Sequence, residues 1–275
     1  MSASRFSLNT ATVGAGLLET IDACARAGIT WIAPWREQFE QVPVAKAARA
    51  IRDAGLSVSS LCRGGFFPAS TEGERRARIA ENRRAVDEAA ALGTDVLVLV
   101  CGGVVGKDLA GSRRMVEEGI AALLPYAEER GVRLGIEPLH PMFAADRSVV
   151  VTLGQANALA ARLASPWVGV VVDVYHVWWD PQLGDAIEDA APWTLGFHVN
   201  DWIVPLPDVL NGRGVMGDGV IDLRELRRQV DDAGYGGPIE VEIFNAELRA
   251  RGLDDCLALL TSRFQENVLP DQLPS

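Results

Sequence analysis

The sequence predicts a single (β/α)8 TIM barrel that occupies residues 1–275. Short apolar runs alternate with longer helical stretches along the whole chain, and this alternation implies parallel strands joined by right-handed crossovers. Eight strand–helix units in about this length match such a barrel. Several predicted helices also end in a glycine directly before the next strand, which is the usual left-handed cap of a helix. Barrels of this size fold as one domain.

The predicted strands are short runs rich in apolar and β-branched residues. In chain order they span residues 6–10, 29–33, 56–62, 95–101, 132–137, 168–173, 194–199 and 238–243. The predicted helices repeat apolar residues at helical spacing, as in Ile79, Val86 and Ala90. They cover residues 15–27, 43–54, 72–92, 112–130, 152–164, 182–190, 222–234 and 247–263. A doubly wound sheet would carry a glycine-rich turn after its first strand, and Gly14-x-Gly16 lacks the third glycine of that turn.

The composition is that of a folded, acidic protein. The formal net charge is −11 and the pI is near 4.8, so the field of the protein repels phosphate backbones and disfavours nucleic acid as a partner. Cys24, Cys62, Cys101 and Cys256 lie far apart, which disfavours a disulfide framework or a thiolate zinc site. The chain has no signal-peptide core and no apolar run near the ~20 residues that span a bilayer. We therefore expect a cytoplasmic protein with no membrane partner, and a homo-oligomer or a partner subunit stays open.

The longest irregular stretch is residues 200–221, which follows the seventh predicted strand. It contains Pro205, Pro207 and a glycine-rich run between Asn211 and Gly219. Long loops in compact domains are usually functional. This one leaves the C-terminal end of the barrel, where active sites lie, so we expect an active-site loop.

Four potential metal ligands stand at the ends of consecutive predicted strands. They are Glu137, Asp173, His198 and Glu242. Neighbouring strand ends converge on one mouth of a barrel, so these side chains can meet on one ion. Three carboxylates and one imidazole suit Mn²⁺, Mg²⁺ or Co²⁺. Each carboxylate alone is typical of a helix cap or a loop charge, and a single histidine there is typical of a hydrogen-bonded structural residue. Burying carboxylates together without a cation would, however, be costly.

The last predicted strand contains a second glutamate. Glu240 and Glu242 alternate with apolar residues, so both carboxylates face the barrel interior. Glu242 is nearer the mouth and is the better ligand. Glu240 would lie one layer deeper, in a buried hydrogen-bond network.

The motifs around these residues resemble the sugar phosphate isomerase/epimerase family. This group of xylose-isomerase-like barrels includes inosose isomerases, inosose dehydratases and ketose 3-epimerases. The motifs are Ile-Glu-Pro at Glu137, Asp-x-x-His at Asp173, Phe-His-x-x-Asp at His198, Gly-Asp-Gly-x-Ile-Asp at Asp218 and Val-Glu-Ile-Phe at Glu242. The resemblance implies that the four ligands hold one divalent ion, for which Mn²⁺ is the first choice. It also implies that Glu137 and Glu242 are the catalytic acid/base pair.

The same resemblance implies that His176 and Arg213 bind substrate oxygens. One departure concerns the residues after the fifth predicted strand, where ketose 3-epimerases carry Glu-Pro-x-Asn-Arg-x-Glu. His140 takes the asparagine position here and Phe143 takes that of the last glutamate. We expect His140 to contact the substrate, and a free ketohexose is disfavoured as that substrate.

The implied reaction is proton abstraction next to a carbonyl group, through an enediolate. The first hypothesis is a divalent-metal-dependent isomerase or epimerase of a keto-sugar or inosose. The alternative is a lyase or dehydratase on the same scaffold. It would either catalyse β-elimination from a 3-oxo-glycoside, as C-glycoside deglycosidases do, or dehydrate an inosose, as inosose dehydratases do. An apurinic endonuclease is a distant alternative that the acidic charge disfavours.

The tryptophans favour a small-molecule sugar, cyclitol or glycoside as the substrate. Trp35, Trp178, Trp179 and Trp202 all follow predicted strands, on the side where the active site is expected. Their flat apolar surfaces fit the C–H faces of a sugar or cyclitol ring. Packing within loops or between subunits is an alternative that explains these tryptophans equally well.

Overall fold

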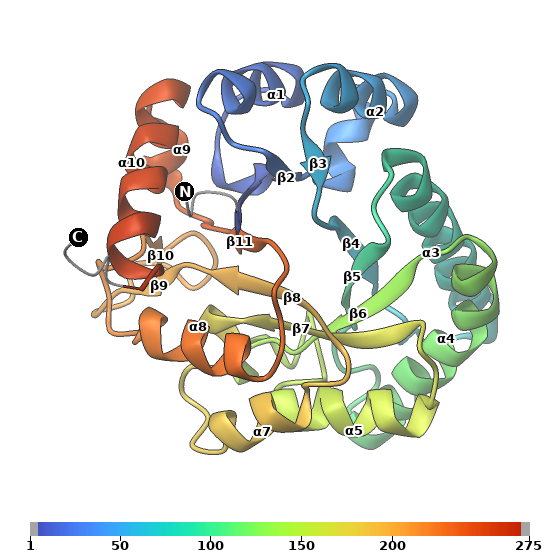
Figure 1. Ribbon diagram of the computed structural model, residues 1–275. Coiled ribbons are helices and arrows are strands. Elements are labelled where there is room, and N and C mark those ends of the chain that lie inside the picture. Colours follow the sequence, from blue (N-terminus) through green and yellow to red (C-terminus); the bar gives the residue numbers. More distant parts are fainter. Residues whose placement is uncertain (1–4, 271–275) are drawn as a thin grey trace.

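The structure is a computed structural model that describes residues 5–270, in which a ring of parallel strands is enclosed by helices (Figure 1). The strands of the barrel are β1 (Phe6–Asn9), β2 (Trp31–Ala33), β3 (Ser57–Val58), β4 (Leu61–Gly65), β5 (Val96–Val100), β6 (Arg133–Glu137), β7 (Val168–Asp173), β8 (Thr194–Val199) and β11 (Ile239–Val241). The helices are α1 (Leu17–Arg26), α2 (Val44–Asp53), α3 (Glu72–Leu92), α4 (Leu109–Glu129), α5 (Leu153–Leu163), α6 (Val174–Val177), α7 (Leu183–Asp189), α8 (Leu223–Asp232), α9 (Ala246–Arg249) and α10 (Leu253–Asn267). Short 3₁₀ turns are η2 (Thr10–Thr12), η3 (Arg36–Glu40) and η4 (Pro141–Phe143).

The strands pair in the order β3-β2-β1-β11-β8-β7-β6-β5-β4, and all neighbours in this sheet are parallel. The two strands at the ends of this order, β3 and β4, are consecutive in the chain. A parallel bridge between Trp35 and Cys62 joins the end of β2 to β4, so the ring closes at this corner. The predicted (β/α)8 barrel is therefore confirmed.

The predicted strand 56–62 is divided in the structure. Ser59 and Ser60 separate β3 from β4, which continues to Gly65. The hydroxyl of Ser59 turns inward and donates to the Glu240 carboxylate at 2.8 Å. The hydrogen bond from Ser59 thus marks the corner between β3, which pairs with β2, and β4, which pairs with β5. No pattern in the local sequence predicts this corner.

Two helix boundaries were predicted wrongly. Helix α4 begins before residue 112, because Asp108 Oδ1 accepts the backbone N–H of Gly111 at 2.7 Å and caps the helix three residues earlier. The predicted helix 247–263 is two helices, α9 and α10. Asn245 caps α9 through the N–H of Leu248, and Gly252 precedes α10.

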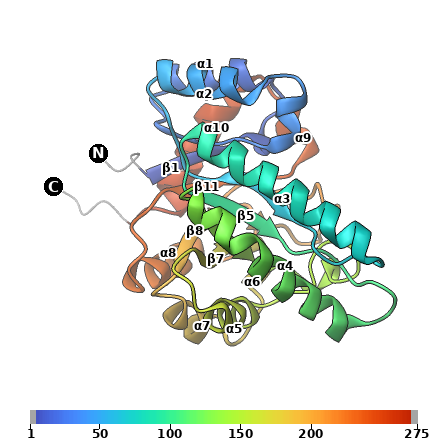
Figure 2. The ribbon, with the colours of Figure 1, turned by 90° about the vertical axis from the view of Figure 1, so that its right-hand side faces the viewer.

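The core lies inside the barrel and between the barrel and its helices. All of β5 is buried, and α3 packs Ala85, Val86 and Ala89 inward. Figure 2, the ribbon turned by 90°, shows α3 and α4 side by side on the outside. Within residues 5–270 no helix is both long and apolar enough to cross a membrane.

Residues 200–221 are more ordered than the sequence predicts. They contain the antiparallel pair β9 (Asp201–Trp202) and β10 (Arg213–Gly214). The Asp201 carboxylate accepts the backbone N–H groups of Gly217, Gly219 and Ile221 at 2.9, 2.8 and 3.1 Å. One buried aspartate therefore holds the returning half of this segment, and this contact links the Phe-His-x-x-Asp and Gly-Asp-Gly motifs physically.

Candidate metal centre

Four buried side chains at neighbouring strand ends gather into one cluster. Glu137 ends β6, Asp173 ends β7, His198 lies near the end of β8, and Glu242 directly follows β11. One potential ligand atom from each lies within 4.8 Å of the others. Asp173 and His198 are register partners across β7 and β8, which places their side chains together. The structure thus brings together the four residues that the spacing of the sequence selects.

The atoms of this cluster fit a cation. His198 Nδ1 lies 3.2 Å from Glu137 Oε1 and 4.0 Å from Glu242 Oε2. Despite these short separations, Glu137 Oε1 and both ring nitrogens of His198 are buried without a hydrogen bond of acceptable geometry. Buried polar atoms are normally paired. Three carboxylates and one imidazole, two of them with unpaired atoms, are a donor set that suits a hard or borderline divalent ion.

Arg213 reaches into the cluster from β10. Its Nη1 donates to Asp173 Oδ2 and to Glu242 Oε2, both at 2.9 Å, and its side chain is almost fully buried. Asp173 uses its other oxygen, Oδ1, to accept from Asn200 Nδ2 and from the backbone N–H of Tyr175, each at 2.9 Å. The expected substrate-binding arginine therefore contacts two of the expected metal ligands directly.

The charges of the cluster shift the pKa values of its members in different directions. Burial raises the pKa of Glu242 to about 8, with Glu137 adding to the rise and Arg213 opposing it. Burial alone would raise the pKa of Asp173, but Arg213 and two neighbouring histidines hold it at about 2. Burial opposes a charged His198, yet the surrounding glutamates, Glu240 first, raise its pKa to about 10. The metal-free cluster therefore holds protons at neutral pH that an ion would replace.

His176 lies beside Arg213 in a neutral state. Burial lowers the pKa of its imidazole to about 3. Its Nδ1 accepts the backbone N–H of His140 at 3.2 Å, and its Nε2 lies 3.2 Å from Arg213 Nη2. A neutral ring whose Nδ1 accepts a hydrogen bond carries its proton on Nε2. A guanidinium can only donate, so a hydrogen bond from Arg213 Nη2 requires Nε2 to be the acceptor, and a neutral ring can accept at only one of its two nitrogens.

The ring of His140 lies farther out. Its centroid is 5.1 Å from that of Trp202 and 5.6 Å from that of Trp179, so it belongs to an aromatic group. Its Nδ1 accepts the backbone N–H of Met142 and caps η4. Unlike His176, it is not among the residues that line the cavity next to the cluster.

A small cavity of about 40 Å³ adjoins the cluster. Its lining consists of Trp35, Cys62, Arg63, Val98, Val100, Glu137, Leu139, Phe143, Arg147, His176, Leu210, Arg213, Glu242 and Phe244. Arg63 stacks over Phe66 at 4.6 Å, and Arg147 lies over Phe143 at 5.7 Å. Leu210 comes from the 200–221 segment, so this segment contributes to the wall of the cavity.

Sequence reasoning missed two buried amides. Asn9, at the end of β1, donates from Nδ2 to Glu242 Oε1 at 3.0 Å and accepts from Trp35 Nε1 at 2.6 Å. Asn200 donates to Asp173 and to the backbone oxygen of Glu242. Asn9 ends β1 and Asn200 directly follows β8, and that position was the signal that could have identified them. They fix the orientation of carboxylates in the cluster.

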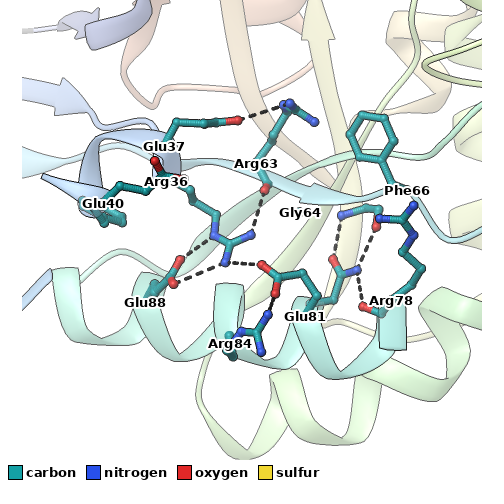
Figure 3. Close-up of a pocket in the computed structure, with 13 residues that line it drawn as sticks. Arg36, Glu37, Glu40, Arg63, Gly64, Phe66, Arg78, Glu81, Arg84 and Glu88 are labelled. Carbon is teal, nitrogen blue, oxygen red and sulfur yellow. Dashed lines mark hydrogen bonds and ion pairs between the residues drawn. The ribbon is translucent and has the colours of Figure 1, made fainter. Parts of the chain in front are cut away.

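A larger hollow of about 420 Å³ lies beside β4, on the far side of Arg63 (Figure 3). Most of its charged groups are paired with one another. Arg36 pairs with Glu81 and Glu88, and Arg63 pairs with Glu37 at 3.2 Å. Of the buried side-chain atoms in residues 5–270 that lack a hydrogen bond, none belongs to a residue of this hollow. We interpret the network as a structural tie between η3 and α3.

Comparisons with known proteins agree with this fold. The profile of the family described as xylose isomerase-like TIM barrel matches residues 21–262. Among curated proteins, the chain is 30% identical over 260 residues to the 3-dehydroshikimate dehydratase of Pseudomonas putida. That alignment covers 89% of this chain but only 38% of the dehydratase, so the chain spans about two fifths of its relative.

Two solved structures have the same architecture. The protein SMc04130 of Sinorhizobium meliloti is 49% identical, with a TM-score of 0.95 and coverage of 97% of this chain and 99% of that one. The IolI protein, whose structure holds a zinc atom, is 18% identical, with a TM-score of 0.82 and coverage of 96% and 98%. At that identity the second likeness concerns the fold alone.

Proposed function

The chain belongs to the xylose isomerase-like TIM barrel family, and we propose that it removes a proton from a small polyhydroxylated ketone. The proton leaves the carbon next to the carbonyl group, and one divalent metal ion assists the reaction. The observation that carries the proposal is the buried cluster of Glu137, Asp173, His198 and Glu242. These four residues would hold the ion. Mn²⁺ is the first choice, Mg²⁺ and Co²⁺ also suit the donor set, and the IolI structure adds Zn²⁺ to the ions to test.

Glu137 and Glu242 are the proposed acid/base pair. When bound, the ion would polarise the carbonyl oxygen and stabilise the negative charge that develops on it. One glutamate takes the proton from the neighbouring carbon, and the other can return a proton at a different carbon or face. In the metal-free protein burial raises the pKa of Glu242 to about 8, and a bound cation would lower that pKa so that the carboxylate is ionised and can accept a proton.

Arg213 and His176 are the proposed substrate-binding groups. The guanidinium of Arg213 places a positive charge beside Asp173 and Glu242, where an oxyanion would need it. His176 lies on the same side, with Nε2 3.2 Å from Arg213 Nη2, and lines the adjoining cavity. His140 remains a proposed contact for a more distant part of the substrate, together with the aromatic rings of Trp179 and Trp202.

The first candidate reaction is isomerisation or epimerisation of a keto-sugar or inosose. It needs a second group that returns the proton after the first has removed it. The cluster contains two buried glutamates whose pKa values are both raised by burial, and this supports such a paired role.

The second candidate is dehydration, in which the same deprotonation is followed by loss of a β-hydroxyl group. Two observations favour it. Curated relatives at 30% identity are named dehydratases. Arg63 and Arg147 also line the cavity beside Glu137 and Glu242, and they offer cationic groups to an acidic substrate.

NMR of products formed in D₂O tests both candidates. The panel contains keto-sugars, inososes, 3-oxo-glucosides and 3-dehydroshikimate, each with Mn²⁺, Mg²⁺, Co²⁺ or Zn²⁺. Solvent deuterium in an intact isomer identifies isomerisation or epimerisation, and loss of water identifies dehydration. No exchange of a carbon-bound proton in any substrate with any ion would contradict the proposed function.

A further inference from the structure

Glu240 lies one layer below the cluster of four potential metal ligands and faces His198, the histidine of that cluster. It belongs to β11, is 2% exposed, and is the register partner of His198 on β8. Its Oε2 lies 3.2 Å from His198 Nε2, while Nδ1 of the same ring lies 3.2 Å from Glu137. The imidazole is therefore held between two carboxylates, one at the cluster and one below it.

Side chains from other strands fix the Glu240 carboxylate. Ser59, at the corner between β3 and β4, donates to Glu240 Oε1 at 2.8 Å, and its hydroxyl lies 2.7 Å from that of Ser7 on β1. Asn9 Nδ2 lies 3.5 Å from Glu240 Oε2 and donates to Glu242 at 3.0 Å. Because Oε1 is occupied by Ser59, Oε2 is the oxygen that faces the ring.

The tautomer of His198 decides whether it can be a ligand. A neutral imidazole has one N–H donor and one lone pair, and a carboxylate can only accept. If Nε2 carries the proton, the carboxylate oxygen 3.2 Å from it is Glu240 Oε2, although no hydrogen bond of acceptable geometry joins the two atoms in the metal-free protein. The Nδ1 lone pair then lies on the side of Glu137 and Glu242. If Nδ1 carries the proton, the lone pair points to Glu240 and the cluster loses its imidazole donor.

We propose that Glu240 is a positioning residue that holds the proton of His198 on Nε2, so that Nδ1 presents its lone pair to the ion bound by the cluster. The inference rests on the metal site of the proposed function and assigns a role to a glutamate outside the four ligands. A carboxylate that accepts the second N–H of a metal-bound histidine fixes the ring and raises its basicity. Ser59 and Asn9 extend this support to β1 and to the corner of the barrel.

Metal binding by Glu240 variants tests the proposal without any substrate. Co²⁺ affinity is measured by calorimetry, and its environment by visible absorption, for the wild type, Glu240→Ala and Glu240→Gln. Removing the acceptor should weaken Co²⁺ binding about 10–100-fold and change the absorption bands. Glu240→Gln keeps an oxygen that can accept the N–H, so its loss should be smaller. Glu88→Gln, which removes a carboxylate that pairs with Arg36 and does not line the cavity next to the cluster, should bind Co²⁺ as the wild type does.

Nitrogen NMR gives a direct reading of the tautomer. The chain has three histidines, so a ¹⁵N-histidine sample gives a simple spectrum. In the Zn²⁺-bound wild type we expect the His198 proton on Nε2 and the metal on Nδ1. Glu240→Gln should keep this tautomer with a weaker hydrogen bond, and it serves as the decisive variant should Glu240→Ala fail to fold.

The outcomes separate this inference from the proposed function. A wild type that binds none of Mn²⁺, Mg²⁺, Co²⁺ and Zn²⁺ would defeat the proposed function itself. A wild type that binds while both Glu240 variants retain its affinity and spectrum would overturn the role of Glu240 and leave the function standing. A His198 proton on Nδ1 in the Zn²⁺-bound protein would also overturn it.

Discussion

The carboxylate of Asp201 is expected to hold the 200–221 segment in place, and replacing it with alanine tests this. Three backbone N–H groups from the far end of the segment, those of Gly217, Gly219 and Ile221, lose their acceptor. The N–H of Ile221 is fully buried, and leaving such a donor unpaired costs about 1–3 kcal/mol. The other two contacts are partly buried, and each contributes about 1 kcal/mol.

The sum predicts that Asp201→Ala lowers the free energy of unfolding by about 3–5 kcal/mol. At about 2–4 °C per kcal/mol for a chain of this size, Tm should fall by roughly 6–20 °C. Asp201→Asn keeps one accepting oxygen, so its loss should be about half as large. Scanning calorimetry of the metal-free protein measures these shifts.

A matched control comes from the same segment. Asp208 also accepts backbone N–H groups, those of Leu210 and Asn211, but it is exposed. Asp208→Asn should change the free energy of unfolding by less than about 0.5 kcal/mol. If Asp201→Ala were as stable as this control, the account of how the segment is held would be wrong.

Three further predictions concern the site. Glu242→Gln should retain part of the metal affinity but lower turnover about 10²–10⁴-fold in a steady-state assay, and near-wild-type turnover would rule out Glu242 as the acid/base group. Because the pKa of His198 is raised to about 10, its ring must lose a proton to bind an ion. The apparent affinity for Mn²⁺ should therefore rise between about pH 6 and about pH 8 in calorimetry, and a pH-independent affinity would show that His198 is no ligand. Arg63→Ala and Arg147→Ala should raise KM for acidic substrates more than for neutral ones, and equal effects on both classes would remove the argument for an acidic substrate.

The sequence predicts the barrel and the cluster because both depend on periodic features. Alternating strands and helices determine the order of elements, and a ligand at the end of each strand must come to the same mouth. Glu137, Asp173, His198 and Glu242 could therefore be selected without coordinates. The same logic placed Glu240 one layer deeper, where the structure has it.

Contacts between residues that are far apart in the chain could not be predicted from the sequence. The split of the third predicted strand depends on Ser59 bonding to Glu240, which is far away in the chain. The strand-end position of Asn9 places its amide at the mouth of the barrel, but the sequence does not tell that the amide meets the Glu242 carboxylate. His140 lies among tryptophans and does not line the cavity. This position depends on how the loops pack, and loop packing leaves no periodic pattern in the sequence from which it could be predicted.

The most direct test of the account is to locate the ion. Anomalous diffraction from crystals grown with Mn²⁺ reports the position of every bound manganese. The account predicts one strong peak in contact with Glu137, Asp173, His198 and Glu242, with Nδ1 as the histidine ligand. A peak elsewhere, or no peak at a saturating concentration of Mn²⁺, would contradict it.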